Sequence, residues 1–248
     1  MNNRVDIIVP VYNEKENFSA LYAGIAKAVR SDWRLLLIYD FPQDSTLEVA
    51  EPISQQDNRV QLVRNASKGA LGAIKTGFDA AAADAVLMLL ADDPPEIIAR
   101  IDALVATCYK THADIVVASR YMKGGAHIGG PLLKGILSRL AGVSLYWAIG
   151  LPTHDATYVT RLYQKSFLES VTIESQRGFE VTLELTIKGY LAGKKIVEIP
   201  VVWRERTVGV SKFQLRKWLP AYLRWFLFGL KNHYRALLLK KSANAART

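Results

Sequence analysis

Cysteine is nearly missing from this sequence, and so are long hydrophobic runs. The single Cys108 among 248 residues excludes an intramolecular disulfide and suits a reducing compartment. No stretch approaches the ~18 uncharged apolar residues of a membrane span, and the apolar run near the start is too short for a signal peptide. We therefore expect a protein of the cytoplasm or of the cytoplasmic face of a membrane.

Acidic residues are nearly missing from the end of the chain. From Arg204 onward there are eleven Lys/Arg residues and one acid, Glu205, whereas the whole chain has a net charge of +9. The part before Arg204 is therefore close to neutral. A neutral body with a strongly basic end requires a separate explanation for that end.

The sequence does contain a regular alternation of apolar runs and segments of helical period. The runs are apolar without alternation, as in strands buried on both faces. They are 5–9, 34–39, 59–63, 85–90 and 114–118. Helices are predicted at about 69–82, 95–109 and 132–148, and one more between the first two strands, where Asn13 and Glu16 resemble a capping box. This order predicts a mostly parallel sheet covered by helices, with ligands at the carboxyl ends of the strands.

A second block follows, and then a basic end. The block has a strand-like run at 156–162, a helix at about 179–192 and a strand at 195–202. The stretch 214–241 is predicted to be helical, with Pro220 in its first turn or at a kink. We expect one domain over residues 1–213 and a basic helical extension over 214–248.

Several segments, most of them after predicted strands, together carry a family resemblance. The first four are Pro10-Val11-Tyr12-Asn13-Glu14, 40–46, 65–72 and Asp92-Asp93-Pro94-Pro95-Glu96. The later ones are 119–121, 137–139, 155–157, 161–163, 178–180, 203–206 and 209–212. This series resembles family 2 glycosyltransferases, and within them the dolichyl-phosphate mannose synthase-like group. The resemblance covers about residues 4 to 213 and implies the nucleotide-sugar-binding α/β fold called GT-A.

The resemblance implies a site for a nucleotide sugar at the ends of the first three strands. The residues it places there are Pro10, Tyr12, Glu14, Asp40, Lys68 and Gly69. The first three would line the base and ribose, and Asp40 would contact the nucleoside. A helix that begins at Gly69 would also present free N–H groups and a favourable dipole to the pyrophosphate. The structural alternative is that the glycine serves a tight turn alone.

The family's metal-binding Asp-x-Asp is missing. Alignment on the Pro-Pro-Glu segment places Met88 and Leu90 at those two acids. Asp92 and Asp93 follow closely, and two adjacent acids suffice for Mg²⁺ or Mn²⁺ where phosphates supply other ligands. The alternative is that both acids cap the helix opened by the two prolines.

Cations follow the later strands, where the resemblance implies contacts to the phosphates of the acceptor and the donor. They are Arg120, Arg139, Arg204, Arg206 and Lys212. Arginine suits this task because its planar guanidinium binds phosphate with two parallel hydrogen bonds. Arg120 is also a catalytic candidate, with Asp92, Asp93 and Asp155. Asp155 would be the base for a hydroxyl acceptor; with a phosphate acceptor, which is already anionic, it would orient Arg161 or the sugar.

The basic end adds an argument about location. Lys217, Arg224 and Lys231 are seven residues apart and share one helical face, and leucines and aromatics occupy much of the remainder. This pattern is typical of a helix in a membrane interface. A helix packed on the core with solvated charges is the alternative. The near-neutral body and the apolar richness of the tail argue against nucleic-acid binding.

We therefore expect an inverting glycosyltransferase that moves a hexose from a nucleoside diphosphate sugar to polyprenyl phosphate. It would use Mg²⁺ or Mn²⁺ and lie on the cytoplasmic face of a membrane, bound through its C-terminal helix. Transfer to a glycan hydroxyl is the alternative within the class, and a catalytically weak nucleotide-sugar-binding membrane scaffold is the alternative outside it. A dinucleotide dehydrogenase is disfavoured because no G-x-G-x-x-G follows the first strand.

Overall fold

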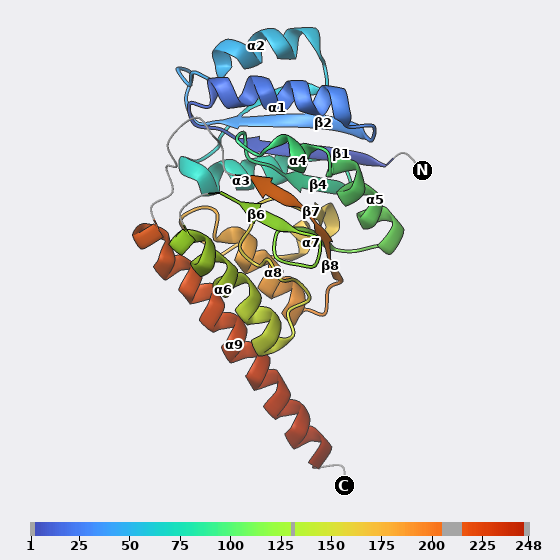
Figure 1. Cartoon of the computed structure of the whole chain (residues 1–248), viewed down its shortest axis with the longest axis vertical. Coiled ribbons are helices and arrows are strands. Elements are labelled where there is room, and N and C mark those ends of the chain that lie inside the picture. Colours follow the sequence, from blue (N-terminus) through green and yellow to red (C-terminus); the bar gives the residue numbers. More distant parts are fainter. Residues whose placement is uncertain (1–2, 130–131, 205–214, 246–248) are drawn as a thin grey trace.

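The body of the protein is a twisted sheet with helices on both faces (Figure 1). The structure, a computed structural model, describes residues 3–129, 132–204 and 215–245. Within them the main sheet has the strand order β3-β2-β1-β4-β7-β5-β8. Its strands are β1 (Arg4–Pro10), β2 (Asp32–Tyr39), β3 (Val60–Arg64), β4 (Ala85–Met88), β5 (Ile115–Ser119), β7 (Arg161–Gln164) and β8 (Ile196–Pro200). β7 pairs antiparallel with both of its neighbours, whereas the other described pairings of this sheet are parallel.

Helices cover each face of the sheet and bury two separate apolar cores. One face is covered by α1 (Lys15–Ala28), α2 (Leu47–Gln56), α4 (Pro95–Ile98) and α5 (Ile101–Thr111). The other is covered by α3 (Gly69–Ala80), α7 (Lys165–Ser170) and α8 (Val181–Leu191). Because helices lie on both faces, β1 from Val5 to Val9 and all of β5 are buried. That explains their largely apolar runs, which Asp6 interrupts in β1, and the predicted mostly parallel sheet is confirmed.

Two further helices pack against α8 rather than against the sheet. They are α6 (Leu132–Ile149) and α9 (Leu215–Ala245), which lie side by side in both figures. Their shared core includes Leu145 of α6, Ile187 of α8 and Trp225 of α9, whose side chain is 2% exposed. A short parallel pair, β6 (Ala126–Ile128) with β9 (Val202–Arg204), lies nearby.

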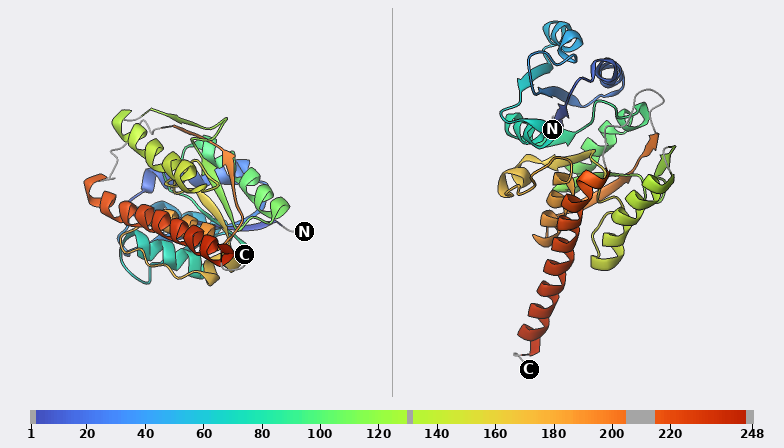
Figure 2. Two further views of the ribbon diagram at one scale, coloured as in Figure 1. Left: turned by 90° about the horizontal axis from the view of Figure 1, so that it is seen from below. Right: turned by 90° about the vertical axis from the view of Figure 1, so that its left-hand side faces the viewer.

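The C-terminal part of α9 extends past the body, as Figure 2 shows. Its middle, from Tyr222 to Leu230, packs on α6 and α8, whereas Leu237, Leu238 and Leu239 are exposed. In the part of the chain that the structure describes, no helix is both long enough and apolar enough to cross a membrane. The packed middle means that the extension shares a core with the body and is not a separate unit.

Two local predictions differ from the structure. Asn13 does not cap α1: it lies outside the helix with φ of 55°, and Glu14 is the residue before the first turn. The predicted helix over 95–109 is two helices, because α4 ends at Ile98 and α5 begins at Ile101. Neither difference changes the sheet.

Candidate active site

Polar and aromatic side chains gather where the parallel strands end, as predicted. The carboxyl ends of β1, β2 and β4 lie at one edge of the sheet, since these strands are parallel neighbours. β5 ends at the same edge, because both β4 and β5 are antiparallel to β7. Three groups lie there: an aromatic pair after β1 and β2, an acidic turn after β4, and a buried ion pair after β5.

The aromatic pair is formed by Tyr12 and Phe41. Their rings meet edge to face with centroids 5.5 Å apart, and Tyr12 is 56% exposed. Pro10 and Glu14, both partly buried, flank Tyr12. Phe41 was not among the predicted site residues, although its position directly after Asp40 was a usable signal. An exposed aromatic ring at the strand ends can offer its face for stacking by a nucleoside base.

A buried carboxylate joins the loops that carry this pair. Asp44 is 2% exposed and accepts hydrogen bonds from the backbone N–H groups of Asn13 and Thr46. The Asn13 side chain in turn accepts from the N–H of Ser45, and the Thr46 hydroxyl accepts from the N–H of Glu14. Asp44 was also missed, although an acid two residues before a threonine is typical of such a turn.

Asp40 organises the turn before α3. Its Oδ1 accepts a hydrogen bond from the Asn65 side chain at 2.5 Å, and its Oδ2 accepts one from the Gly69 N–H at 2.9 Å. Gly69 has φ of +81°, which glycine adopts without strain, and Lys68 beside it is exposed. The N–H that we expected to meet a pyrophosphate is therefore bound to Asp40, and the acid adds negative charge at that helix end.

The acidic turn after β4 contains two acids in different environments. Asp92 is partly exposed, whereas Asp93 is 6% exposed. The Asp93 carboxylate accepts hydrogen bonds from the Leu90 N–H at 3.0 Å and from the Tyr158 and Thr160 hydroxyls at 2.7 Å each. Burial raises the pKa of Asp93 to about 6, although these hydrogen bonds oppose the shift. Asp93 thus joins the β4 turn to the segment before β7.

Whether a divalent cation fits here depends on which side chains could serve as its ligands. Met88, at one of the family's metal positions, is fully buried in β4. Over the described ranges, no three His, Cys, Asp or Glu side chains come together as a metal site. The Asp93 carboxylate is buried and bound by three protein donors, whereas Asp92 is partly exposed, so Asp92 is the more accessible candidate ligand of the predicted pair. One carboxylate still fits a cation whose other ligands are phosphate oxygens and water.

The buried ion pair after β5 joins Arg120 to Asp155. Nε of Arg120 is 2.7 Å from Oδ2 and Nη2 is 3.0 Å from Oδ1, while the backbone N–H groups of Arg120 and Tyr158 also donate to this carboxylate. Burial alone raises the pKa of Asp155, but the charge and hydrogen bonds of Arg120 lower it below its ordinary value. Both oxygens are engaged, so the geometry does not support Asp155 as a general base.

A second buried arginine, Arg161, fixes the segment that carries Asp155. Its guanidinium donates to the backbone carbonyls of Asp155 at 2.7 Å, Tyr158 at 2.9 Å and Thr182 at 3.2 Å. We expected Asp155 to orient Arg161. Instead, Arg161 fixes the main chain around Asp155, and the Asp155 side chain binds Arg120. Both arginines hold the loop rigidly at the sheet edge.

The other predicted cations lie in different places. Arg139 on α6 is exposed and lines a cavity with Tyr121 and His154. Arg204 is exposed at the end of β9, where its Nε lies 3.2 Å from Oε1 of Glu96. Arg206 and Lys212 fall outside the described residues. The structure therefore brings Arg120 and Arg139 near one loop, and it pairs Arg204 with the Pro-Pro-Glu turn.

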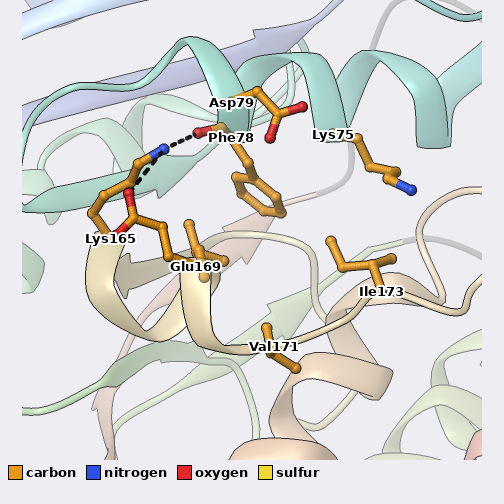
Figure 3. A pocket seen from close by; sticks show the side chains of 8 residues that line it. Lys75, Phe78, Asp79, Lys165, Glu169, Val171 and Ile173 are labelled. Carbon is orange, nitrogen blue, oxygen red and sulfur yellow. Dashed lines mark hydrogen bonds and ion pairs between the residues drawn. The ribbon is translucent and has the colours of Figure 1, made fainter.

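A smaller cavity, of about 160 Å³, lies between α3 and α7 (Figure 3). Lys165 borders it, donating to the Phe78 carbonyl at 2.6 Å and lying 3.9 Å from Glu169. α7 follows the carboxyl end of the antiparallel strand β7. This cavity is therefore at the opposite end of the sheet from the predicted site, and none of the predicted site residues lines it.

Comparison with solved structures shows the same fold. Glucosyl-3-phosphoglycerate synthase from Mycobacterium tuberculosis, solved with Mn²⁺, UDP and glucosyl-3-phosphoglycerate, superposes with a TM-score of 0.67 at 15% identity, covering 93% of this chain and 79% of that one. S. aureus TarS with UDP-GlcNAc gives a TM-score of 0.64 at 16% identity, covering 91% and 66%. The expected GT-A-like fold is confirmed.

Comparison of sequences identifies the family. A dolichol-phosphate mannosyltransferase of Pyrococcus furiosus is 30% identical over 218 residues, which cover 85% of this chain and 59% of that protein's length. A polyprenol monophosphomannose synthase of Mycolicibacterium smegmatis is 29% identical over 219 residues, covering 84% of this chain and 80% of that protein. The family model for glycosyl transferase family 2 matches residues 6–172, more than half of the chain. The chain therefore belongs to glycosyl transferase family 2.

Proposed function

We propose that this protein transfers a hexose from a nucleoside diphosphate sugar to a polyprenyl phosphate, with inversion at the anomeric carbon. Family membership supports a nucleotide-sugar glycosyltransferase. The two named relatives carry dolichol phosphate and polyprenol in their names, and both are mannose enzymes by name. Mannose is therefore the first sugar to test.

The choice of acceptor rests on the burial and hydrogen bonding of the Asp155 carboxylate. A sugar hydroxyl must lose its proton in the reaction, so a positioned base is required. Asp155, the best candidate for that base, is buried and bound by Arg120 through both oxygens. A phosphate monoester is already anionic and needs cations rather than a base. A site whose acid serves to hold an arginine favours the phosphate acceptor.

In the proposed reaction an acceptor phosphate oxygen attacks the anomeric carbon. The bond from that carbon to the diphosphate oxygen breaks on the opposite face, and its electron pair leaves with the nucleoside diphosphate. Tyr12 and Phe41 would stack on the base, and Arg120, fixed by Asp155, would supply positive potential beside the reacting groups. Preorganised charge of this kind stabilises the transition state because it requires no rearrangement during the reaction.

Asp92 is the residue that would contact a divalent cation. Related folds are known with Mn²⁺ or Mg²⁺ together with UDP, which supports the use of a divalent cation here. When bound, such an ion would neutralise charge on the departing diphosphate. Asp93 would shape the turn that presents Asp92, through its bonds to Tyr158 and Thr160.

The proposed location is the cytoplasmic face of a membrane, with α9 as the contact. The support is the row of exposed leucines on α9, at Leu219, Leu223 and Leu227, beside exposed basic residues. A lipid-linked acceptor also requires its enzyme to reach the bilayer surface.

The test is transfer of label into lipid. The protein is incubated with a panel of radiolabelled nucleotide sugars, Mg²⁺ or Mn²⁺ and a polyprenyl phosphate, and chloroform-soluble label is counted. We expect label with one sugar and none when the free polyprenol replaces its phosphate. Label in a glycan but not in lipid would favour the hydroxyl acceptor. Nucleotide-sugar binding without any transfer or hydrolysis would favour the scaffold.

A further inference from the structure

Tyr158 is a buried residue, 5% exposed, that contacts three separate groups of the candidate site. Its hydroxyl donates to Oδ1 of Asp93 at 2.7 Å, and its backbone N–H donates to Oδ1 of Asp155 at 3.2 Å. Its ring lies against Arg120, whose guanidinium carbon is 4.4 Å from the ring centroid. The proposed reaction gives Tyr158 itself no task, so this combination of contacts needs its own explanation.

The turn after β4 is closed by two hydrogen bonds between Leu90 and Asp93. The Asp93 N–H donates to the Leu90 carbonyl at 3.1 Å, and the Leu90 N–H donates to Oδ2 of Asp93 at 3.0 Å. Asp92 lies inside this closed turn, directly before Asp93. Whatever holds the Asp93 side chain inward therefore also holds the backbone from which Asp92 projects.

Two hydroxyls from the segment before β7 hold the Asp93 side chain, one on each carboxylate oxygen. Tyr158 donates to Oδ1 and Thr160 donates to Oδ2, both at 2.7 Å. Burial raises the pKa of the Tyr158 phenol well above its ordinary value, so its hydroxyl keeps the proton that it donates. The Thr160 carbonyl accepts a hydrogen bond from the Ala118 N–H of β5 at 3.3 Å, which ties the segment to the sheet. The turn after β4 is thus anchored to a distant and firmly held part of the chain.

The remaining contacts of Tyr158 support the pair of Arg120 and Asp155. Its N–H is one of the donors to the Asp155 carboxylate, and its ring carries the Arg120 guanidinium. A cation over an aromatic face is attracted by the ring, more strongly where water is excluded, and Arg120 is buried. Because one rigid phenol carries both the hydroxyl and the cation contact, its length sets the separation between the Asp93 carboxylate and the guanidinium.

We propose that Tyr158 is a positioning residue, which fixes the turn that presents Asp92 and the guanidinium of Arg120 relative to each other. The proposal rests on the proposed function, in which Asp92 contacts a divalent cation and Arg120 supplies positive potential. Met88 and Leu90 stand where the family has its two metal-binding acids. In this chain the Tyr158 hydroxyl compensates for their absence by locking the turn in which Asp92 lies.

The experiment measures how much Mn²⁺ tightens the binding of a nucleoside diphosphate. UDP and GDP are titrated into the full chain by calorimetry, once with Mn²⁺ and once with EDTA, and the tighter binder is used for the variants. We expect Mn²⁺ to increase the affinity of wild type at least tenfold. Tyr158→Phe keeps the ring against Arg120 and removes the hydroxyl alone. It should reduce the increase to less than threefold, because loss of a residue that orients a metal ligand commonly costs about 10–100-fold in metal affinity. The affinity in EDTA should not change.

Two other tyrosines provide matched controls. Tyr22→Phe removes a hydroxyl that donates to Asp57 at 3.0 Å; Asp57 precedes β3 and so lies at the opposite edge of the sheet from the site. Tyr163→Phe removes a buried hydroxyl of β7 that has no hydrogen-bond partner among the residues that the structure describes. Both should keep the wild-type increase with Mn²⁺. Thr160→Val, which removes the second hydroxyl from Asp93, should instead behave like Tyr158→Phe, and it serves as the test if Tyr158→Phe does not fold.

The transfer assay tests whether Tyr158 acts through the turn of Asp92. Tyr158→Phe and Asp92→Asn should each lower kcat about tenfold. The double variant should be little slower than Asp92→Asn alone, because both changes affect the same contact and effects of coupled residues do not add. The acceptor KM of Tyr158→Phe should stay within twofold of wild type, since the ring and the N–H that support Arg120 and Asp155 remain.

Three outcomes would overturn the proposal. The first is a wild type whose affinity for both nucleotides is the same with Mn²⁺ and with EDTA. The second is a full Mn²⁺ effect in Tyr158→Phe and Thr160→Val. The third is equal weakening of nucleotide binding with and without Mn²⁺, which would show that the hydroxyl only stabilises the fold. Failure of the proposed function looks different, because Tyr158→Phe would then lose the Mn²⁺ effect as expected, yet no nucleotide sugar would label polyprenyl phosphate.

Discussion

Asp92 and Asp93 are adjacent in sequence, yet the structure gives them different tasks. The Asp93 side chain turns inward and accepts three hydrogen bonds, two of them from residues 65 and 67 positions further along the chain. Asp92 stays partly exposed at the sheet edge. The sequence placed both acids at the site but could not separate them, because the partners of Asp93 come from a distant segment.

Substitution of each acid should separate catalysis from stability. Asp92→Asn should lower kcat/KM at least tenfold and change the free energy of unfolding by less than about 0.5 kcal/mol, as is usual for a surface position. Asp93→Ala should lower the free energy of unfolding by about 2–4 kcal/mol, because it leaves a buried N–H and two buried hydroxyls without their acceptor. Urea unfolding and the transfer assay give the two numbers. Normal turnover and normal Mn²⁺ dependence in Asp92→Asn would remove Asp92 from the metal site.

For other residues at this edge, the sequence indicated the position but not the bonding partner. Asp40 and Asp155 were both placed at the site by the family resemblance of their segments. Their bonding to Gly69 and Arg120 joins residues 29 and 35 positions apart, which no local pattern encodes. Phe41 and His154 were not predicted as site residues. Their contacts with Tyr12 and Glu198 form only when the loops fold together.

At the scale of elements, the position of α6 depends on one glycine. Gly142→Ala would bring a methyl group to 2.9 Å from the backbone oxygen of His154, and the backbone cannot rotate away as a side chain can. Gly229 of α9 is the matched control, since its added methyl would lie 3.2 Å from the flexible side chain of Ile187. Both changes gain about 1 kcal/mol of helix propensity.

We expect Gly142→Ala to lower the free energy of unfolding by about 1–2 kcal/mol, because overpacking commonly costs about 1–3 kcal/mol. It should also raise the acceptor KM severalfold, since α6 carries Arg139. Gly229→Ala should be neutral or slightly stabilising. Urea unfolding of both variants checks the first part, and acceptor titration in the transfer assay checks the second. Equal effects of the two alanines would show that α6 is not tightly placed against the loop at His154.

β1, β2 and the end of α3 meet at the other edge of the sheet through Asp6. This fully buried carboxylate accepts hydrogen bonds from Arg34 and from the N–H groups of Ala82 and Ala83. Burial raises the pKa of Asp6, but these partners outweigh it and lower the pKa below its ordinary value. A lowered folded pKa means that the stabilisation is present above about pH 4 and is lost as the pH falls through the folded value.

Asp6→Asn should therefore lower the free energy of unfolding by about 3 kcal/mol at pH 7, the usual effect of breaking a buried pair. It should also flatten the decline of stability between pH 4 and pH 2. Asp32→Asn, on the exposed first residue of β2, is the control and should leave both unchanged. Unfolding curves collected across this pH range measure the effect. The same acid decline in Asp6→Asn as in wild type would contradict the assignment.

The elements themselves were predictable wherever burial imposed a simple pattern. The first five predicted strands are all present. β4 and β5 are buried throughout, and strands covered on both faces need apolar runs. β7 was harder: the run predicted at 156–162 is strand only from Arg161. The preceding residues are buried but irregular in structure around Asp155. A buried irregular segment has the same apolar composition as a buried strand, so the sequence does not distinguish the two. The antiparallel direction of β7 also depends on partners far along the chain.

At the scale of the whole molecule, α9 is a packing helix in its middle and carries an exposed surface that keeps the membrane interpretation a prediction. Its middle is a packing helix, since Trp225 is buried and donates through Nε1 to the Ser175 hydroxyl at 3.0 Å. Its exposed leucines, together with Trp147 of the adjacent α6, leave an apolar surface uncovered. The exposed basic residues Arg224, Lys231 and Arg235 lie on the same helix. This combination supports contact with an anionic bilayer surface by a helix that is also part of the fold.

Membrane binding should accordingly have two separable parts. Leu219, Leu223 and Leu227 are 55%, 49% and 53% exposed and lie four residues apart on one face of α9, so their insertion gives a contribution that salt does not screen. The basic residues add about 1 kcal/mol each near an anionic surface, and salt weakens that part. Changing all three leucines to Gln should reduce sedimentation with both neutral and anionic vesicles. Changing Arg224, Lys231 and Arg235 to Glu should reduce it with anionic vesicles alone, most strongly at low salt.

The leucine variant should unfold at the wild-type urea concentration, because its three side chains are exposed. The charge-reversal variant should unfold at a slightly lower one, because the Arg224 guanidinium carbon lies 5.2 Å from the centroid of the Trp225 ring and that contact is lost. That control matters, since truncation of α9 would remove the packed middle together with the exposed surface. Wild type should bind anionic vesicles strongly and neutral vesicles weakly, and its binding to anionic vesicles should fall as salt rises. If wild type sediments with neither kind of vesicle at low salt, α9 is a packing helix throughout, and a lipid acceptor would then have to reach the site without help from this surface.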